Sequence, residues 1–229
     1  MIALPDAETL TGLLAAWLLL LAASLWAGRE KLGLTKRMLM ASIRGLLQLL
    51  IVASVLHFIF DINHPGAQAG IILLLCLIAA RISAGHFSAT RPAWISAATG
   101  LVVACLLTLP WLVFFGAISS ESRALIPLAS MVVANAMNAV SLMLDRIDSG
   151  QDAAAGIRGA LIPPVDTLRV VGLVHLPGIF VGMLLAGAAP LEAAGAQLVV
   201  LYMIVASTFT ACVTCRHMLN RLQGTHACA

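Results

Sequence analysis

The chain has 229 residues, of which 61% are hydrophobic and only 10% are charged, and its mean hydropathy is +1.03. Soluble domains carry about 25% charged residues, so water could not solvate the surface of a fold with this composition. The sequence therefore predicts an integral membrane protein surrounded by lipid. The net charge of +3 is too small to indicate a nucleic-acid partner.

The apolar runs are continuous rather than alternating, which is typical of membrane-spanning helices and not of a β-barrel. The first ten residues contain no Lys or Arg, so we expect the first run to be retained rather than cleaved as a signal peptide. The sequence predicts an all-α, polytopic fold with about seven transmembrane helices in one domain, residues 1–229. The expected spans are residues 10–28, 38–60, 67–84, 92–118, 124–144, 170–189 and 196–215.

Basic residues gather on alternate connections between these spans, whereas the other connections hold only Arg123. Lys and Arg remain on the cytoplasmic side of a membrane, so we expect the N-terminus outside and the C-terminus inside. The residues that set this orientation are Arg29, Lys31, Lys36, Arg37, Arg81, Arg91, Arg146, Arg158, Arg169, Arg216 and Arg221.

Known catalytic signatures are missing from the sequence: it contains no HExxH, GxSxG or GxxxxGK[ST] motif. We therefore predict that the chain is not an enzyme, has no cofactor, and depends on a separate subunit for any ATP hydrolysis. Cys212 and Cys215 form a CxxC pair near His217, but the further ligands of a zinc site are not recognisable. Buried thiols are the favoured interpretation, and no metal site is predicted.

Arg44 lies inside the second span, and Gln48 follows four residues later on the same helix face. An arginine at the bilayer centre costs about 2.5–3.5 kcal/mol on insertion scales. Either Arg44 extends its guanidinium to the inner interface, or the two side chains line a polar translocation path.

A stripe of small and polar residues runs along the fifth span, with Asn138 on it and Asn135 beside it. Such residues pack helices closely, and this interpretation is favoured over direct contact with a substrate. Asn135 and Asn138 are nevertheless candidates for the translocation path. The other members of the stripe are Ser130, Ala134 and Ser141.

The connection after the fifth span holds many charges and two helix breaks. Pro163 and Pro164 predict the end of any helix begun near Ala153, after which Asp166 would cap a new helix and Arg169 would remain at the inner interface. This arrangement predicts an interfacial elbow. The candidates for elbow or coupling roles are Asp152, Arg158, Pro163, Asp166, Arg169, Pro177 and Gly178.

Pro177 and Gly178 predict a kink or break one turn into the sixth span. Broken helices at membrane depth occur where backbone lines a cavity or a protein interface. A simple packing kink explains the two residues equally well.

The stretch IPPVDTLRVVGLVHLPGIFVGMLLAGAAPLEAAGAQLVV, residues Ile162 to Val200, resembles the signature region of the FetB-type permeases. Two further stretches match: REKLGL followed by Arg44 and Gln48, and IPLASMVVANAMNAV at Ile126 to Val140. The matching signature positions are Ile162, Pro163, Asp166, Arg169, Gly172, Leu176, Pro177, Gly178, Gly182, Gly187, Pro190, Ala194 and Gln197.

This resemblance implies the membrane subunit of a bacterial ABC transporter linked to iron export, with plant relatives linked to aluminium tolerance. It further implies a multi-pass permease of the inner membrane that forms a homodimer and works with a cytoplasmic ABC ATPase subunit. Ser130 and Ala134 stand where the family tends to have glycine, and the connection at 145–169 is shorter than the family's amphipathic coupling segment. The alternative hypothesis is therefore a transporter or channel that needs no ATPase.

Overall fold

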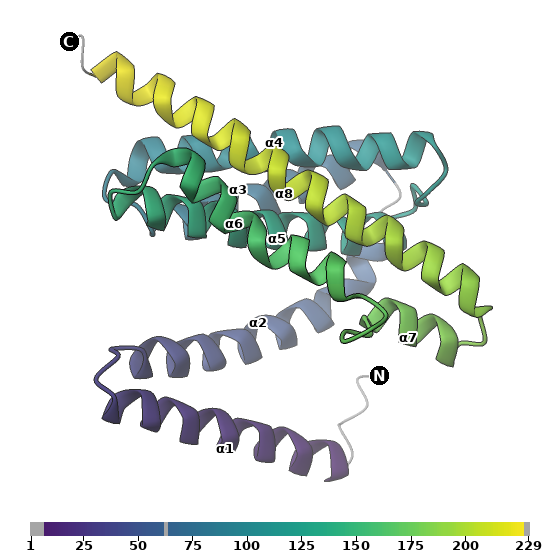
Figure 1. The fold of residues 1–229 in the computed structure, drawn as a ribbon. Helices are drawn as coiled ribbons and strands as arrows, with labels where there is room; N and C mark the ends of the chain where they lie inside the picture. The colour runs from purple at the N-terminus through teal and green to yellow at the C-terminus, as the bar shows by residue number, and fades with distance from the viewer. Residues whose placement is uncertain (1–6, 62–63, 227–229) are drawn as a thin grey trace. The chain divides into compact units, whose positions relative to one another are not determined.

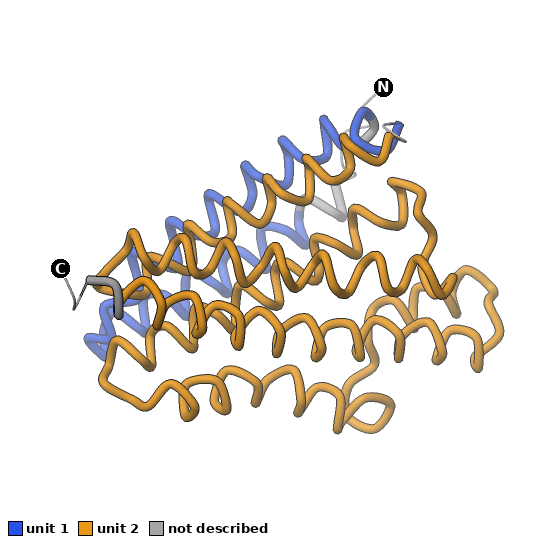
Figure 2. The backbone as a smooth tube through the Cα atoms, turned by 90° about the horizontal axis from the view of Figure 1, so that it is seen from above, with its two compact units in different colours: residues 1–61 blue, residues 62–229 orange. Residues whose placement is uncertain are grey.

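The computed structural model describes residues 7–61 and 64–226, and every regular element within these ranges is an α-helix. The all-α class predicted from composition is confirmed. Contacts divide the chain into two compact units, Met1–Asp61 and Ile62–Ala229 (Figure 2). The range predicted as one transmembrane domain thus contains two separately packed groups of helices.

The first unit is a hairpin of two helices, α1 (Ala7–Arg29) and α2 (Thr35–Asp61), which lie side by side (Figure 1). Thr35 Oγ1 donates a hydrogen bond of 2.8 Å to the carbonyl oxygen of Ser24, which joins the start of α2 to α1. Gly28 permits this contact, because a Cβ there would lie 2.9 Å from the same hydroxyl oxygen. Most other side chains of the hairpin are exposed.

The second unit is a bundle in which α4 packs on α3 and α8, and α5 packs on the same two helices. Its core consists mainly of small residues such as Ala97, Ala104 and Ala136, which permit close approach of helices within a membrane. The helices of this unit are α3 (Pro65–Ala84), α4 (Thr90–Phe114), α5 (Ser122–Asp148), α6 (Ala153–Val170), α7 (Gly178–Leu185) and α8 (Pro190–His226).

The closest approach in this bundle lies between α4 and α8, at Gly100. A Cβ on Gly100 would lie 2.6 Å from the carbonyl oxygen of Ala211 and 3.1 Å from the Cβ of Cys215. The two backbones therefore touch at a position where only glycine fits.

The helix α6 differs from the predicted elbow. It begins at Ala153, where the Asp152 carboxylate accepts a hydrogen bond of 3.2 Å from the backbone N–H of Ala154, and it continues through Pro163 and Pro164 to Val170. The prediction that these prolines end the helix is wrong, and so is the predicted cap at Asp166. Proline within a helix removes backbone hydrogen bonds, but packing against neighbouring helices sustains it at membrane depth; α6 packs on both α5 and α8.

The predicted sixth span, 170–189, is not one continuous helix. The α6 helix ends at Val170, a non-helical segment follows, and α7 begins at Gly178 with Pro177 as its N-cap. The break predicted at Pro177 and Gly178 is therefore present. Figure 1 shows α6 running back alongside α5, and α7 continuing towards the start of α8, so the return path from α5 to α8 consists of two helices.

Candidate functional site

A cavity of about 340 Å³ lies where α5, α6 and α8 meet, and it is the feature that unites several predicted site residues. Its α5 wall carries two asparagines, and its α6 wall carries the double proline and Thr167. The residues around it are Asn135, Asn138, Ala139, Leu142, Ala160, Pro163, Pro164, Thr167, Leu201 and Ile204.

The two asparagines are held differently. Asn135 Nδ2 donates a hydrogen bond of 2.9 Å to the carbonyl oxygen of Met131 in its own helix. The side-chain oxygen of Asn135 takes no part in this hydrogen bond. Asn138 is exposed on α5. On the α6 side, Thr167 Oγ1 donates to the carbonyl oxygen of Pro163 at 2.9 Å. The cavity wall therefore carries side-chain amides that can form hydrogen bonds, which lipid cannot do.

The stripe of small and polar residues predicted on α5 has an inward-facing part and an exposed part. Ser141 faces inward, where its hydroxyl donates a hydrogen bond of 3.0 Å to Ser83 Oγ of α3. Ser130, Ala134 and Asn138 are exposed on the second unit. Only Ser141 therefore packs two helices within the chain, and the exposed part of the stripe is free to face water or another surface.

Asp166 and Arg169 form an ion pair on α6, with 3.4 Å between Oδ1 and Nη1 and with side chains that are 55% and 75% exposed. The α6 helix runs antiparallel to α5, since a Cβ on Gly156 would lie 3.3 Å from the carbonyl oxygen of Met143, and Thr167 shares the cavity with Asn135. At 1.5 Å per residue, Asp166 lies roughly 20 Å along α6 from its first residue.

This places Asp166 level with the middle of α5, a helix that is long and apolar enough to cross a membrane. That Arg169 stays at the inner interface remains a prediction. Charged side chains within a bilayer are costly against lipid and face water or protein instead. The ion pair lies on the exposed face of α6, next in sequence to the cavity residues Pro163 and Thr167.

The remaining predicted residues are not assembled into this site. Arg44 and Gln48 lie exposed on α2, in the other unit. Arg158 is exposed near the start of α6, close to Asp152 in sequence. Pro177 and Gly178 belong to the break before α7, which opens on a second, smaller cavity.

Two polar residues of this region were assigned no site role from the sequence: Thr167, and Gln197, which was named only as a position of the family signature. Gln197 is buried on α8 and lines the smaller cavity at the helix break. The available signal was its place on one face of α8 together with Leu201 and Ile204, at the helical spacing i, i+4 and i+7.

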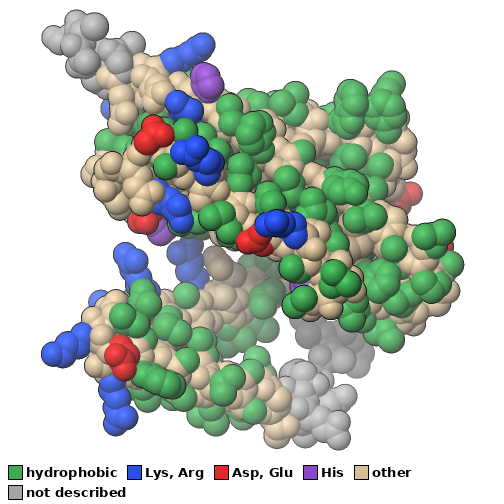
Figure 3. All heavy atoms as spheres, in the orientation of Figure 1, with side chains coloured by type: hydrophobic (Ala, Val, Ile, Leu, Met, Phe, Trp, Pro, Cys, Tyr) green, Lys and Arg blue, Asp and Glu red, His purple; other side chains and the backbone are tan. Residues whose placement is uncertain are grey.

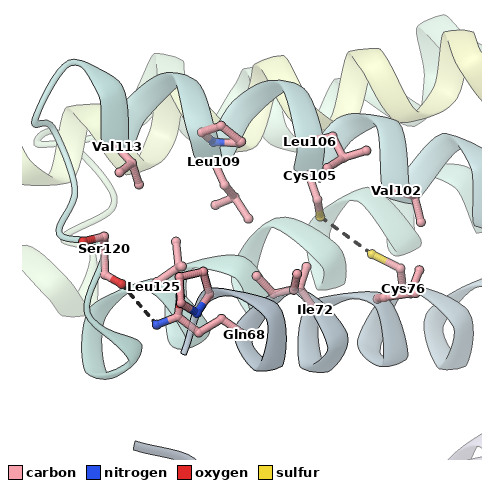
Figure 4. A pocket seen from close by; sticks show the side chains of 14 residues that line it. Gln68, Ile72, Cys76, Val102, Cys105, Leu106, Leu109, Val113, Ser120 and Leu125 are labelled. Atoms are coloured by element: carbon pink, nitrogen blue, oxygen red, sulfur yellow. Dashed lines mark hydrogen bonds between the residues drawn. The ribbon is translucent and has the colours of Figure 1, made fainter. Parts of the chain in front are cut away.

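A third cavity, of about 450 Å³, opens between α3, α4 and α5 (Figure 4). Its wall is almost entirely apolar, with Gln68 as a polar exception: the Gln68 amide donates 2.8 Å to Ser122 Oγ and 3.2 Å to the Ser120 carbonyl oxygen. The Cys76 and Cys105 sulfur atoms point towards each other at 3.7 Å. The Gln68 amide in this cavity is therefore hydrogen-bonded to two oxygen atoms.

Within the described residues, no group of three or more His, Cys, Asp or Glu side chains is placed to hold a metal ion. Cys212 and Cys215 are buried, as predicted for packed thiols, whereas Cys228 lies outside the described residues.

In the part of the chain that the structure describes, six helices, α1 to α5 and α8, are long and apolar enough to cross a membrane. In the second unit, Lys and Arg side chains gather at the end from which the C-terminal part of α8 projects (Figure 3). The fold and these apolar helices define a multi-pass, all-helical membrane protein.

The chain belongs to the uncharacterised protein family UPF0014, whose family model matches residues 10–155 and 150–222. It is 33% identical to the probable iron export permease protein FetB of Escherichia coli, over 90% of each chain. It is also 29% identical to the UPF0014 membrane protein YjkA of Bacillus subtilis, over 80% of this chain and 82% of that one. A plant relative, the protein ALUMINUM SENSITIVE 3 of Arabidopsis thaliana, is 27% identical over 89% of this chain and 83% of its own length. No solved structure matches the chain significantly.

Proposed function

We propose that the chain is the membrane-spanning permease subunit of an ABC transporter of the cell inner membrane that exports a metal cation such as iron. A separate cytoplasmic ATPase subunit supplies the energy, and two permease chains form the membrane part. The similarity to a probable iron export permease along 90% of the chain supports the cargo. The N-terminus lies outside and the C-terminus inside, in agreement with the basic end of the second unit.

The observation that carries this proposal is the Asp166–Arg169 ion pair, exposed level with the middle of α5 beside a cavity with Asn135 and Asn138 on its wall. An ion pair on a helix face that contacts lipid is energetically costly. A helix that lines a hydrated path or a dimer axis requires polar groups there. We place the translocation path along this face of α5 and α6. Arg44 and Gln48 of α2, in the first unit, are separate candidates for lining a polar path.

The ATPase has two surfaces on which to dock. The first is the α5–α6 turn, where Asp152 caps α6 and Arg158 is exposed one turn later. The second is the C-terminal part of α8, which projects beyond the bundle in Figure 1. At 37 residues α8 is about 55 Å long, which exceeds the thickness of the hydrocarbon layer.

An ATPase-independent transporter or channel is the second candidate, and the short connection between α5 and α6 favours it. Only Ser149 to Asp152 separate the two helices, so no amphipathic coupling helix lies between them. In this case the same polar face conducts the cation without a partner.

Co-purification and transport distinguish the two candidates. The chain is expressed together with a candidate ABC ATPase subunit, purified in nanodiscs, and reconstituted into vesicles for ATP-dependent iron flux. We expect a stable complex and flux that requires ATP and the ATPase. Iron flux that continues without either one would establish the second candidate, and the absence of flux together with unchanged cellular iron in a deletion strain would refute both.

A further inference from the structure

The apolar cavity between α3, α4 and α5 runs along two antiparallel helices. Its α3 wall extends from Pro65 to Cys76, and its α4 wall extends from Val102 to Val113. At 1.5 Å per residue, each wall is about 17 Å long. The hydrocarbon layer of a membrane is about 30 Å thick, so this length is close to the thickness of one leaflet.

The two ends of the cavity differ in polarity. Figure 4 shows Gln68 and Ser120 at one end and the sulfur atoms of Cys76 and Cys105 at the other. Both cysteines are buried, and their sulfur atoms approach to 3.7 Å, so they close the apolar end. At the other end, the Gln68 amide donates to Ser122 Oγ and to the Ser120 carbonyl oxygen. The cavity is therefore polar at one end only.

The cavity opens sideways, out of the bundle. Leu73 of α3 and Leu106 of α4 line it and are 47% and 64% exposed, so they form its rim. Trp111, next in sequence to the lining residue Pro110, is 63% exposed on α4. Tryptophan gathers at the boundary between lipid and water. This position indicates that the polar end of the cavity lies near the membrane surface and that the cysteine end lies in the hydrocarbon.

The volume of the cavity suits a hydrocarbon chain. It is about 450 Å³. A methylene group takes up about as much space as a water molecule, whose share of liquid is about 30 Å³, so the cavity has room for about 15 methylene groups. A helix with its side chains is about 10 Å across. Spread over the length of the two walls, the cavity is much narrower than that, so it admits a chain and not a helix.

We propose that this cavity is a lipid site that holds one acyl chain of a membrane phospholipid. The chain lies between α3 and α4 with its methyl end towards Cys76 and Cys105, and the headgroup lies at the membrane surface beside Gln68 and Ser120. A hydrocarbon chain requires no hydrogen bonds, and it supplies the van der Waals contacts that an empty cavity lacks. Because the chain touches three helices of the folded unit, its binding stabilises the second unit.

Native mass spectrometry of the full chain, purified in a mild detergent, tests the site. The purified chain is titrated with phosphatidylglycerol that carries one palmitoyl and one oleoyl chain. We expect one tightly retained phospholipid per chain, together with a Tm that rises by about 5 °C at saturating lipid.

Ile72→Trp, on the α3 wall, fills the cavity with an indole ring. It should weaken lipid binding about tenfold or more and remove the lipid-dependent rise in Tm, because the ring occupies the space of the chain. Leu74→Trp is the matched control, since Leu74 lies on the same helix, is 57% exposed and does not line this cavity. It should bind lipid as the wild type does. The Tm measured without lipid reports whether each variant is folded.

Val113→Trp repeats the test from the α4 wall, at the polar end. Wild-type lipid affinity in both Ile72→Trp and Val113→Trp would overturn the site. So would a wild-type chain that binds no phospholipid, a result showing that side chains of the hairpin or of a second copy fill the cavity. None of these measurements involves metal export, so the lipid site and the proposed function stand or fall separately.

Discussion

The two units of this protein contain membrane helices of similar apolar character, but the fraction of buried residues differs strongly between them. In the membrane windows of α1 and α2, 6% and 0% of residues are buried, whereas the windows of α3, α4, α5 and α8 have 33% to 44% buried. The difference follows from the number of neighbours, since each hairpin helix packs on one other helix, whereas α3, α4, α5 and α8 each pack on two or more. Helices in lipid gain nothing from apolar contact as such, and they associate where Ala, Gly and Ser permit close approach and hydrogen bonds.

The largest expected effect concerns the α4–α8 crossing. Gly100→Leu should destabilise the second unit by about 3 kcal/mol, since even a Cβ would lie 2.6 Å from the Ala211 carbonyl oxygen. Gly45→Leu, at a position on α2 with nothing within 4 Å of a Cβ, should have almost no effect. Thermal unfolding in detergent compares the two variants. Equal losses would show that the contrast between the units is wrong.

Arg44→Leu tests the exposed hairpin. Removing this charge should ease membrane insertion by about 2.5 kcal/mol, the lower end of the range for an arginine at the bilayer centre. We expect iron export to fall at the same time if Arg44 lines the path. An insertion assay and vesicle flux measure the two effects separately, and wild-type flux would mean that Arg44 only extends to the interface.

Asp166→Leu should lower export about tenfold, which corresponds to roughly 1.4 kcal/mol. The change leaves Arg169 without its 3.4 Å partner on the polar face of α6. Asp152→Ala provides the contrast, since it removes a helix cap worth about 0.5–2 kcal/mol of stability and no group at membrane depth. Unchanged metal tolerance in cells carrying Asp166→Leu would contradict a path along α6.

The smallest expected effect concerns hydrogen bonds between helices. Ser141→Ala removes the 3.0 Å bond to Ser83 that joins α5 to α3, and it should cost about 0.6 kcal/mol. Ser54→Ala on α2 removes only a bond within its own helix, to the Ile51 carbonyl oxygen, and should be close to neutral. Chemical denaturation of the two variants measures this difference. A larger loss in Ser54→Ala would place unrecognised packing on the hairpin.

Two prolines of α6 limited the accuracy with which the candidate site could be predicted from the sequence. Pro163 and Pro164 predict the end of a helix, because proline removes backbone hydrogen bonds and the sequence does not reveal the packing that compensates for their loss. In the structure, Gly156 and Gly159 bring α6 against α5, where a Cβ on Gly159 would overlap the Arg146 guanidinium. This packing keeps the helix intact. The elbow was therefore placed too close to Asp166, while the break at Pro177 was placed correctly.

By itself, the sequence determined that lipid surrounds this protein, that its elements are helices, and that its basic residues favour one set of helix ends. These properties are local, since each depends on the apolar character and charge of a short run of residues. Only the tertiary structure decided that Asp166 and Arg169 lie level with the middle of α5, and that the buried Gln197 carboxamide oxygen has no hydrogen-bond partner among the described residues. Depth and hydrogen-bond satisfaction depend on which residues of distant segments meet, and no single run of sequence contains that information.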